Sequence, residues 1–259
     1  MKRFVFAVIL LASCGKLSYS PYSGSVKSKN LNVSNLAAIQ SSTKATTGGD
    51  VFSIAVISDT HDYYDHLEDQ VEFINGMSKY HFVIVTGDIT NLGMQTEYAK
   101  AVEILDRLTI PYIVVVGNHD LLGDGDRIFP KLFGDYNFEF TYKNTRLVFY
   151  NNNNWESDEA DAIGVYPQSV FSGDTSTHRL LFAHVMPHDR DRFTQELVDQ
   201  NESMVTNYNI NYFVCGHNHN GGEVSFGSGS VLVVGSSVKR RILEINVSGG
   251  TISNAYISL

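Results

Sequence analysis

Five short polar motifs along this chain each follow a run of apolar, mostly β-branched residues. Apolar runs of this length, closed by turn-forming residues, predict buried strands. Because open α/β sheets bind ligands at the carboxyl ends of their strands, we expect the motifs to meet at one sheet edge. In chain order the motifs are Asp59-Thr60-His61 after residues 51–58, Gly87-Asp88 after 82–86, Gly117-Asn118-His119-Asp120 after 112–116, His184 after 180–183, and Gly216-His217-Asn218-His219 after 212–215.

The segments between these runs have the spacing of amphipathic helices. Residues 67–80 and 96–108 place apolar side chains three and four positions apart, which predicts a helix in each. Residues 51–116 are therefore expected to form a β-α-β-α-β unit, whose right-handed crossovers make its strands parallel. The later expectations are an antiparallel pair at 138–142 and 145–150, a weaker helix at 191–206, and a second, partly antiparallel sheet from the β-rich runs of 222–259.

Length, charge and cysteine content limit the class of protein. The chain has 259 residues, and a body over 51–259 is long enough to bury roughly 70% of its unfolded surface as one domain. The formal charge of −9, with no basic run longer than Lys239-Arg240-Arg241, argues against a nucleic-acid partner. Cys215 is the only cysteine of that body, so we expect no internal disulfide there.

The N-terminal segment predicts export. Lys2 and Arg3 precede an apolar run that is too short to span a membrane, and Leu11-Ala12-Ser13-Cys14 resembles a bacterial lipobox. That resemblance implies cleavage before Cys14 and a lipid anchor on its sulfur; an ordinary secretory signal that contains a cysteine is the alternative. We expect a signal peptide at 1–13, a lipidated Cys14 with a flexible polar tether to residue 50, and a folded domain at 51–259, attached to a bacterial membrane in the cell envelope, on its periplasmic or extracellular face.

The side chains in the motifs suit metal ions. Imidazole and carboxylate ligands together bind Zn, Fe, Mn and related metals. Two Asp, one Asn and four or five His are too many ligands for one tetrahedral ion and about the right number for two.

The ordered motif set resembles that of the calcineurin-like metallophosphoesterase superfamily, from about residue 51 to residue 221. The family pattern is Asp-x-His, Gly-Asp, Gly-Asn-His-Asp/Glu, His and Gly-His-x-His. The resemblance implies an α/β fold in which a two-sheet β-sandwich is flanked by helices, with two divalent or trivalent metal ions (Mn, Fe or Zn). Size and motif shape are similar to the compact bacterial branch that includes cyclic-nucleotide phosphodiesterases. Asn91 replaces the Tyr of purple acid phosphatases, which excludes that subgroup.

The resemblance also implies a role for each motif residue. One metal would be bound by Asp59, His61, Asp88 and His219, and the other by Asp88, Asn118, His184 and His217. Asp88 would then bridge the two ions.

Two further residues are assigned to catalysis by the same resemblance. His119 has no metal role in the family, and it would protonate the leaving group or stabilise the transition state. Asp120 would orient the His119 imidazole. In the fourth motif His188, four residues after His184, is the alternative ligand.

The implied function is hydrolysis of a small phosphomonoester or phosphodiester by attack of a metal-bridged hydroxide. A catalytically silent metal-binding scaffold at the cell surface and a nuclease are the alternatives. The segments 121–135 and 151–172, which we expect to set specificity, carry no recognisable signature. Asn151–Asn154 and Trp155 lie where a substrate could touch the protein, and a solvated polar loop is the alternative for them.

Overall fold

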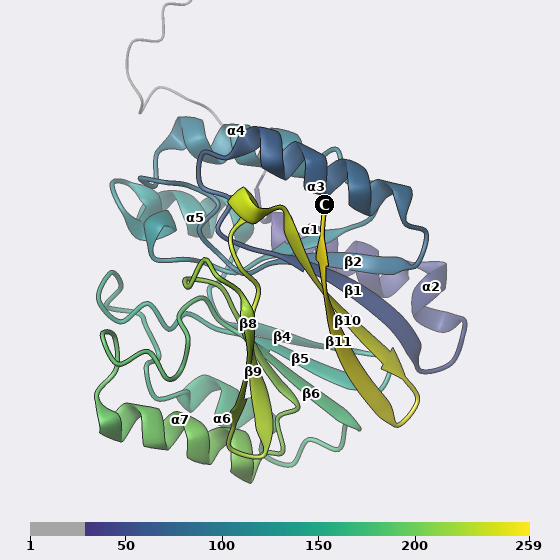
Figure 1. The fold of residues 1–259 in the computed structure, drawn as a ribbon, viewed down its shortest axis with the longest axis vertical. Coiled ribbons are helices and arrows are strands. Elements are labelled where there is room, and N and C mark those ends of the chain that lie inside the picture. The colour runs from purple at the N-terminus through teal and green to yellow at the C-terminus, as the bar shows by residue number, and fades with distance from the viewer. Residues whose placement is uncertain (1–28) are drawn as a thin grey trace, which may run out of the picture.

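Two β-sheets packed face to face contain the apolar runs of the sequence (Figure 1). The computed structural model describes residues 29–259. The first sheet has the strand order β11-β10-β1-β2-β3 and the second β4-β5-β6-β7-β9-β8. The strands are β1 (Val51–Ile57), β2 (Tyr80–Val85), β3 (Tyr112–Val114), β4 (Phe138–Tyr142), β5 (Thr145–Phe149), β6 (His178–Phe182), β7 (Tyr212–Cys215), β8 (Gly222–Phe226), β9 (Gly229–Val233), β10 (Arg241–Ser248) and β11 (Thr251–Ser258).

Helices cover the outer face of each sheet, so the expected α/β/β/α architecture is confirmed. Three apolar clusters separate the four layers. One lies between the first sheet and α3 to α5, one between the two sheets, and one between the second sheet and α6 and α7. The helices are α1 (Leu31–Ser41), α2 (Thr43–Thr46), α3 (Tyr64–Gly76), α4 (Gln95–Leu105), α5 (Gly125–Phe133), α6 (Val165–Phe171) and α7 (Gln195–Asn207).

The parallel β-α-β-α-β unit is also confirmed. β1, β2 and β3 are parallel neighbours, and β5, β6, β7 and β9 form a second parallel set. Each of the five polar motifs therefore begins at the carboxyl end of β1, β2, β3, β6 or β7. The expected single edge proves to be made by both sheets together.

The expectation that residues 222–259 contribute a second, partly antiparallel sheet is confirmed for β8 and β9 and wrong for β10 and β11. The β8–β9 hairpin extends the second sheet, whereas β10 pairs with β1 and brings β11 into the first sheet. Leu243, Ile245 and Val247 of β10 face the apolar cluster between the sheets, so burial of that face fixes the pairing.

The expectation of a flexible tether up to residue 50 is wrong for residues 31–46, which form α1 and α2. The side chain of Asn32 donates to the Val114 carbonyl oxygen at 2.8 Å and accepts from the Val114 N–H at 2.9 Å, as a neighbouring strand would. Ile39 is buried in the cluster between the sheets. α1 thus covers the open edge of β3. The sequence did not predict this helix because the segment before residue 50 is polar on average. Cys14 and the predicted signal peptide lie outside the described residues.

Removal of α1 should destabilise the domain. A chain starting at residue 51 is expected to lose about 3–5 kcal/mol of unfolding free energy relative to one starting at residue 29, since the apolar contacts of Ile39 and the paired hydrogen bonds of Asn32 are lost. The melting temperature should fall by about 10 °C. Within the longer chain Asn32→Ala should destabilise and Val33→Ala, at an exposed position, should not. Equal stability of the two chain lengths by thermal and urea unfolding would contradict this account.

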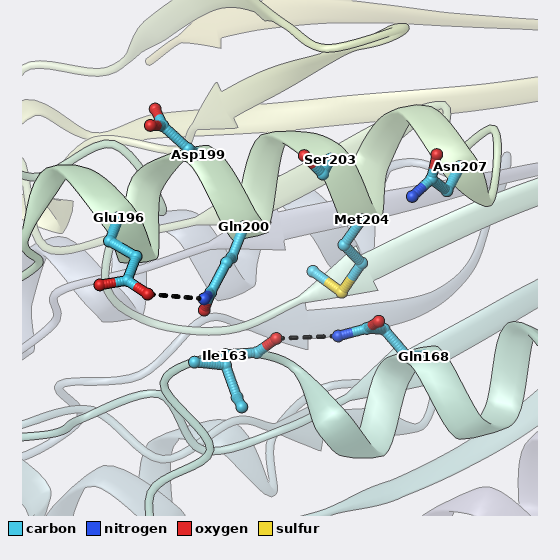
Figure 2. Close-up of a pocket in the computed structure, with 8 residues that line it drawn as sticks. All are labelled: Ile163, Gln168, Glu196, Asp199, Gln200, Ser203, Met204 and Asn207. Carbon is cyan, nitrogen blue, oxygen red and sulfur yellow. Dashed lines mark hydrogen bonds between the residues drawn. The ribbon is translucent and has the colours of Figure 1, made fainter.

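A cleft of about 580 Å³ separates α6 from α7 (Figure 2). Ile163 and Gln168 line one wall, and Glu196, Gln200 and Met204 of α7 are among the residues of the other. None of the lining residues belongs to the five motifs, so the cleft is separate from the predicted ligands. Within the described residues no helix has both the length and the apolar character needed to cross a bilayer.

Candidate metal centre

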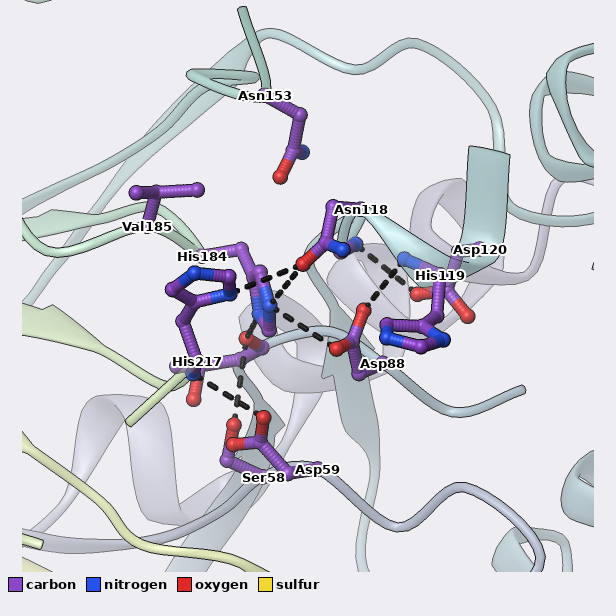
Figure 3. A network of polar contacts seen from close by, with 12 residues as sticks. Ser58, Asp59, Asp88, Asn118, His119, Asp120, Asn153, His184, Val185 and His217 are labelled. Atoms are coloured by element: carbon purple, nitrogen blue, oxygen red, sulfur yellow. Dashed lines mark hydrogen bonds and ion pairs between the residues drawn. The ribbon is translucent and has the colours of Figure 1, made fainter. Parts of the chain in front are cut away.

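The predicted ligands come together at the carboxyl ends of strands from both sheets. Figure 3 shows Asp59, Asp88, Asn118, His184 and His217 of this cluster. Three overlapping groups form, and within each group the potential ligand atoms lie within 4.8 Å of one another. The groups are Asp59, His61 and His219; His61, Asp88 and His119; and Asp88, His184 and His217. The first and third groups correspond to the two metal sites implied by the sequence, and the second joins them.

Asp88 lies at the centre of the cluster and is buried. Its Oδ2 is 3.2 Å from His184 Nε2 and 3.8 Å from His61 Nε2. Its Oδ1 accepts the backbone N–H of His119 at 2.9 Å. One carboxylate oxygen therefore faces imidazoles from both implied metal sites, which is the position that a bridging ligand requires.

Asn118 and Asp59 occupy opposite sides of this centre. Asn118 Oδ1 is 3.1 Å from His184 Nε2 and 3.0 Å from His217 Nδ1. Asp59 Oδ1 is 3.4 Å from His219 Nε2 and accepts the His217 backbone N–H at 3.1 Å. The fifth motif thus contacts both the first and the third motif, although more than ninety residues separate it from either.

Backbone carbonyl groups orient two of the imidazoles. His184 Nδ1 lies 2.8 Å from the Thr86 carbonyl oxygen, and His61 Nδ1 lies 3.2 Å from that of Thr90. A carbonyl oxygen only accepts hydrogen bonds, so in the neutral ring the proton resides on Nδ1 and the lone pair on Nε2. Both Nε2 atoms face Asp88.

Four of the implied ligands have backbone conformations that side chains rarely adopt. The φ angles are 50° at Asp59, 43° at His61, 53° at Asp88 and 67° at His217. Left-handed conformations at non-glycine residues are unfavourable and gather at functional sites, where the surrounding structure enforces them. The chain accepts this strain where it brings ligand side chains together.

Two buried ligand atoms have no hydrogen-bond partner within the described residues. These are Asp59 Oδ2 and His61 Nε2. Buried polar atoms are almost always paired, because leaving one unpaired costs about 1–3 kcal/mol. A cation would satisfy both atoms, and carboxylate, amide and imidazole donors are the set that Zn, Fe and Mn accept. The residues present therefore fit a pair of metal ions.

The electrostatics favour the metal-binding forms of Asp88, His61 and His217, whereas the neighbouring carboxylates Asp88 and Asp59 raise the pKa of His184 and His219. Burial acts to raise the pKa of Asp88, but the imidazoles of His184, His119 and His61 hold that pKa below its usual range. Burial lowers the pKa of His61, and it lowers that of His217 to about 4 with help from His184. Near neutral pH, Asp88 is thus ionised and both of the latter imidazoles keep a free lone pair.

Two motif glycines permit these close approaches. A Cβ at Gly117 would overlap the backbone nitrogen and Oδ1 of Asp88, and one at Gly216 would overlap Asp59 Oδ2. Neither position has a positive φ, so the glycines are needed for space rather than for a left-handed turn.

Gly117→Ala is therefore expected to weaken metal binding roughly 10- to 100-fold, as loss of a ligand's supporting contact does. Displacement of Asp88 by the added methyl group is the cause. Isothermal titration of chelator-stripped protein with Zn²⁺ or Mn²⁺ measures the effect. Gly76→Ala is the matched control, because a Cβ at Gly76 meets nothing within 4 Å. If Gly117→Ala bound metal with wild-type affinity, the close packing of Gly117 against Asp88 would not shape the site.

His119 stands beside the first group, with its ring centroid 4.8 Å from that of His61. The expectation that Asp120 orients its imidazole is wrong. His119 Nδ1 instead lies 2.7 Å from the Asn91 carbonyl oxygen. Sequence reasoning missed this partner because every residue has a carbonyl group.

Asp120 has a structural role in the described contacts. Its carboxylate accepts the backbone N–H groups of Thr90 and Gly117, each at 2.9 Å, and the Thr90 hydroxyl at 2.9 Å. It therefore joins the turn after Asp88 to the turn before His119. Burial, and next the charge of Asp88, raise the pKa of Asp120.

The loop after β6 separates the two candidate histidines of the fourth motif. His184 joins the cluster, whereas the His188 ring packs near Phe226, with 5.9 Å between ring centroids. The same loop contributes Asp189, whose Oδ2 is 3.7 Å from His217 Nε2. This carboxylate, which the sequence did not single out, faces the side of the His217 ring opposite Asn118.

Comparisons with known proteins agree with this arrangement. The family model described as calcineurin-like phosphoesterase matches residues 52–221. A probable cyclic nucleotide phosphodiesterase of Xenorhabdus bovienii is 25% identical over 167 residues, which cover 62% of this chain and 54% of that protein. This chain therefore spans about half the length of that relative.

Solved structures with the same fold show lower identity. A dimetal phosphatase from Danio rerio is 15% identical with a TM-score of 0.60, over 81% of this chain and 99% of that one. GAP50, the anchor in the inner membrane complex of Plasmodium, is 11% identical with a TM-score of 0.63, over 81% and 85% of the two chains.

Proposed function

This chain belongs to the calcineurin-like phosphoesterase family, and on that premise we propose that it is a two-metal hydrolase of small phosphomonoesters or phosphodiesters. The observation that carries the proposal is the position of Asp88. It is a buried carboxylate between imidazoles of two ligand groups, beside ligand atoms of Asp59 and His61 that have no hydrogen-bond partner in the described residues. Such an arrangement is costly for a domain without bound cations and favourable for one that binds them.

The residues would divide into two sites with Asp88 in common. One ion would be held by Asp59, His61, Asp88 and His219, and the other by Asp88, Asn118, His184 and His217. Bound ions of this kind acidify water and stabilise charge on phosphoryl oxygens. Mn, Fe and Zn all suit these donors.

His119 is the proton donor in this proposal. The Asn91 carbonyl oxygen holds the Nδ1–H group, so the ring is fixed with Nε2 as its second proton-carrying atom. A protonated His119 can then donate from Nε2 to the oxygen that leaves phosphorus.

A diester substrate has specific support. The relative from Xenorhabdus bovienii is described as a probable cyclic nucleotide phosphodiesterase. A substrate panel on Mn²⁺- or Zn²⁺-loaded protein tests the function, with bis-p-nitrophenyl phosphate, p-nitrophenyl phosphate and 3′,5′-cyclic nucleotides. We expect turnover of at least one ester. Fully metallated protein without turnover on the panel would favour the silent scaffold, and salt-sensitive digestion of DNA would favour the nuclease.

We also propose that the protein is exported and anchored through Cys14. The support is the basic and apolar leader and the lipobox-like Leu11-Ala12-Ser13-Cys14. Cys14→Ala is expected to move the protein from the membrane fraction to the soluble fraction and to abolish palmitate labelling, because the thiol is the attachment atom. Cys215→Ala, at a buried position within the domain, should leave both unchanged. Labelling that persists without Cys14 would overturn the anchor.

A further inference from the structure

Trp155, the only tryptophan of the chain, presents an open ring face to solvent. The residue is 65% exposed, and the guanidinium carbon of Arg192 lies 4.4 Å from its ring centroid. Because Arg192 covers one face while most of the residue stays accessible, the other face must be open. A tryptophan ring combines a large apolar face with a polar N–H group, and this residue type is enriched at binding interfaces.

Arg192, which stacks on one face of the Trp155 ring, is held in place by its own hydrogen bonds. Arg192 Nη1 is 2.8 Å from both carboxylate oxygens of Glu156, and the Arg192 carbonyl oxygen accepts from Asn154 Nδ2 at 2.9 Å. Little of the Arg192 side chain is exposed. Stacking on Trp155 would therefore require little further ordering, which favours binding.

The loop that carries Trp155 is attached to two ligand-bearing segments. Asn153 Nδ2 donates to the Val116 carbonyl oxygen at 3.1 Å, just before Gly117 and Asn118. Asn152 makes paired hydrogen bonds of 2.7 and 3.0 Å with the backbone of Val185, directly after His184. In the view of Figure 3, Asn153 lies on the Asn118 side of the ligand cluster, away from Asp59.

Arg192 connects the tryptophan to the other side of the centre. Its backbone N–H donates to the Asp189 carbonyl oxygen at 3.3 Å. The Asp189 carboxylate in turn lies 3.7 Å from His217 Nε2. The Trp155 loop is therefore hydrogen-bonded to Val116 in the segment that leads to Asn118, and Arg192 connects it to Asp189, which faces His217.

A cavity of about 290 Å³ adjoins the ring and has an acidic lining. Its walls include Asn154, Tyr136, Asp126, Asp158 and Glu159. Carboxylates repel a phosphate group but accept hydrogen bonds from amino groups. The charge of the cavity would thus direct the phosphoester toward the metal centre and an amino-bearing ring toward Trp155.

We propose that Trp155 is a stacking platform for the nucleobase of a nucleotide phosphoester. This inference rests on the proposed function, because the metal centre must receive the phosphoester end of the same molecule. Aromatic side chains stack on bases of any sequence, and the acidic cavity favours adenine, guanine and cytosine, which carry exocyclic amino groups.

Fluorescence of the single tryptophan tests the contact directly. Metal-loaded wild-type protein is titrated with a non-hydrolysable phosphonate analogue of adenosine monophosphate, with ribose 5-phosphate and with phosphocholine. We expect saturable quenching by the nucleotide analogue alone. Quenching by phosphocholine instead would assign the site to a cationic group, and no quenching by any of the three would remove the platform; either result overturns the proposal.

Kinetics supply the second arm. Trp155→Ala should lower the ratio of kcat/KM for a nucleotide ester to kcat/KM for a glycerol phosphodiester by about 10- to 100-fold, mainly through KM. Trp155→Phe should keep most of the ratio, and Val165→Ala, at another exposed apolar position, should keep all of it. An unchanged ratio in Trp155→Ala overturns the platform while the phosphoesterase function stands. Absence of all turnover in wild-type protein would instead refute the function.

Discussion

Asp88→Asn is expected to lower kcat on bis-p-nitrophenyl phosphate by at least about 1000-fold, since loss of metal-based charge stabilisation costs several kcal/mol of the barrier. The Asp88 carboxylate faces the imidazoles of His61 and His184 from a buried position. An amide at this position has one oxygen and no charge, so it cannot serve two cations equally. Metal content measured on the same sample should fall below two ions per chain.

The matched control is Asp65→Asn, on the exposed surface of α3. It should retain wild-type kcat and metal content. Thermal unfolding of both variants shows whether Asp88→Asn is folded. A folded Asp88→Asn protein that keeps more than a tenth of wild-type activity would mean that Asp88 does not bridge the ions.

The second large effect concerns proton transfer by His119. His119→Gln is expected to lower kcat on esters with alkyl leaving groups by about 100- to 10,000-fold, the range for loss of a general acid. The effect on p-nitrophenyl esters should be much smaller, because p-nitrophenolate leaves without a proton. A plot of log kcat against leaving-group pKa should therefore be steeper for the variant than for the wild type.

The control for this prediction is His178→Gln. His178 begins β6, at the end of the strand away from the metal centre, and its Nε2 is 3.0 Å from the Gly249 carbonyl oxygen. The slope of log kcat against leaving-group pKa for His178→Gln should match that of the wild type. Equal losses on alkyl and p-nitrophenyl esters in His119→Gln would show that the residue stabilises the site without acting as the acid.

The local sequence pattern was sufficient to predict the layered core and the position of the motifs at the ends of the strands. Buried apolar runs and helical spacing predicted β1 to β3, α3 and α4 from short-range signals. The predicted helix 67–80 begins and ends later than α3 (Tyr64–Gly76). Its end is misplaced because Met77 and Tyr80 continue the helical spacing although Tyr80 opens β2. Helix and strand periods coincide over such short apolar stretches.

Pairings that depend on distant residues could not be predicted in the same way. β10 pairs with β1, and Val51 lies directly opposite Ser248 although nearly the whole domain separates the two residues in sequence. Asn32 satisfies the edge of β3 through one side-chain amide within a segment of polar composition. The Asn91 carbonyl oxygen that holds His119 has no signature, because backbone groups are common to all residues.

A metal titration that follows activity tests the central claim most directly. Chelator-stripped protein containing the described residues 29–259 is titrated with Mn²⁺ or Zn²⁺, and hydrolysis of bis-p-nitrophenyl phosphate is measured at each step. The two-metal account predicts that activity rises to its maximum as two ions bind per chain and that Asp88→Asn stays inactive throughout. Full activity with one bound ion, or two bound ions without turnover of any phosphoester, would contradict it.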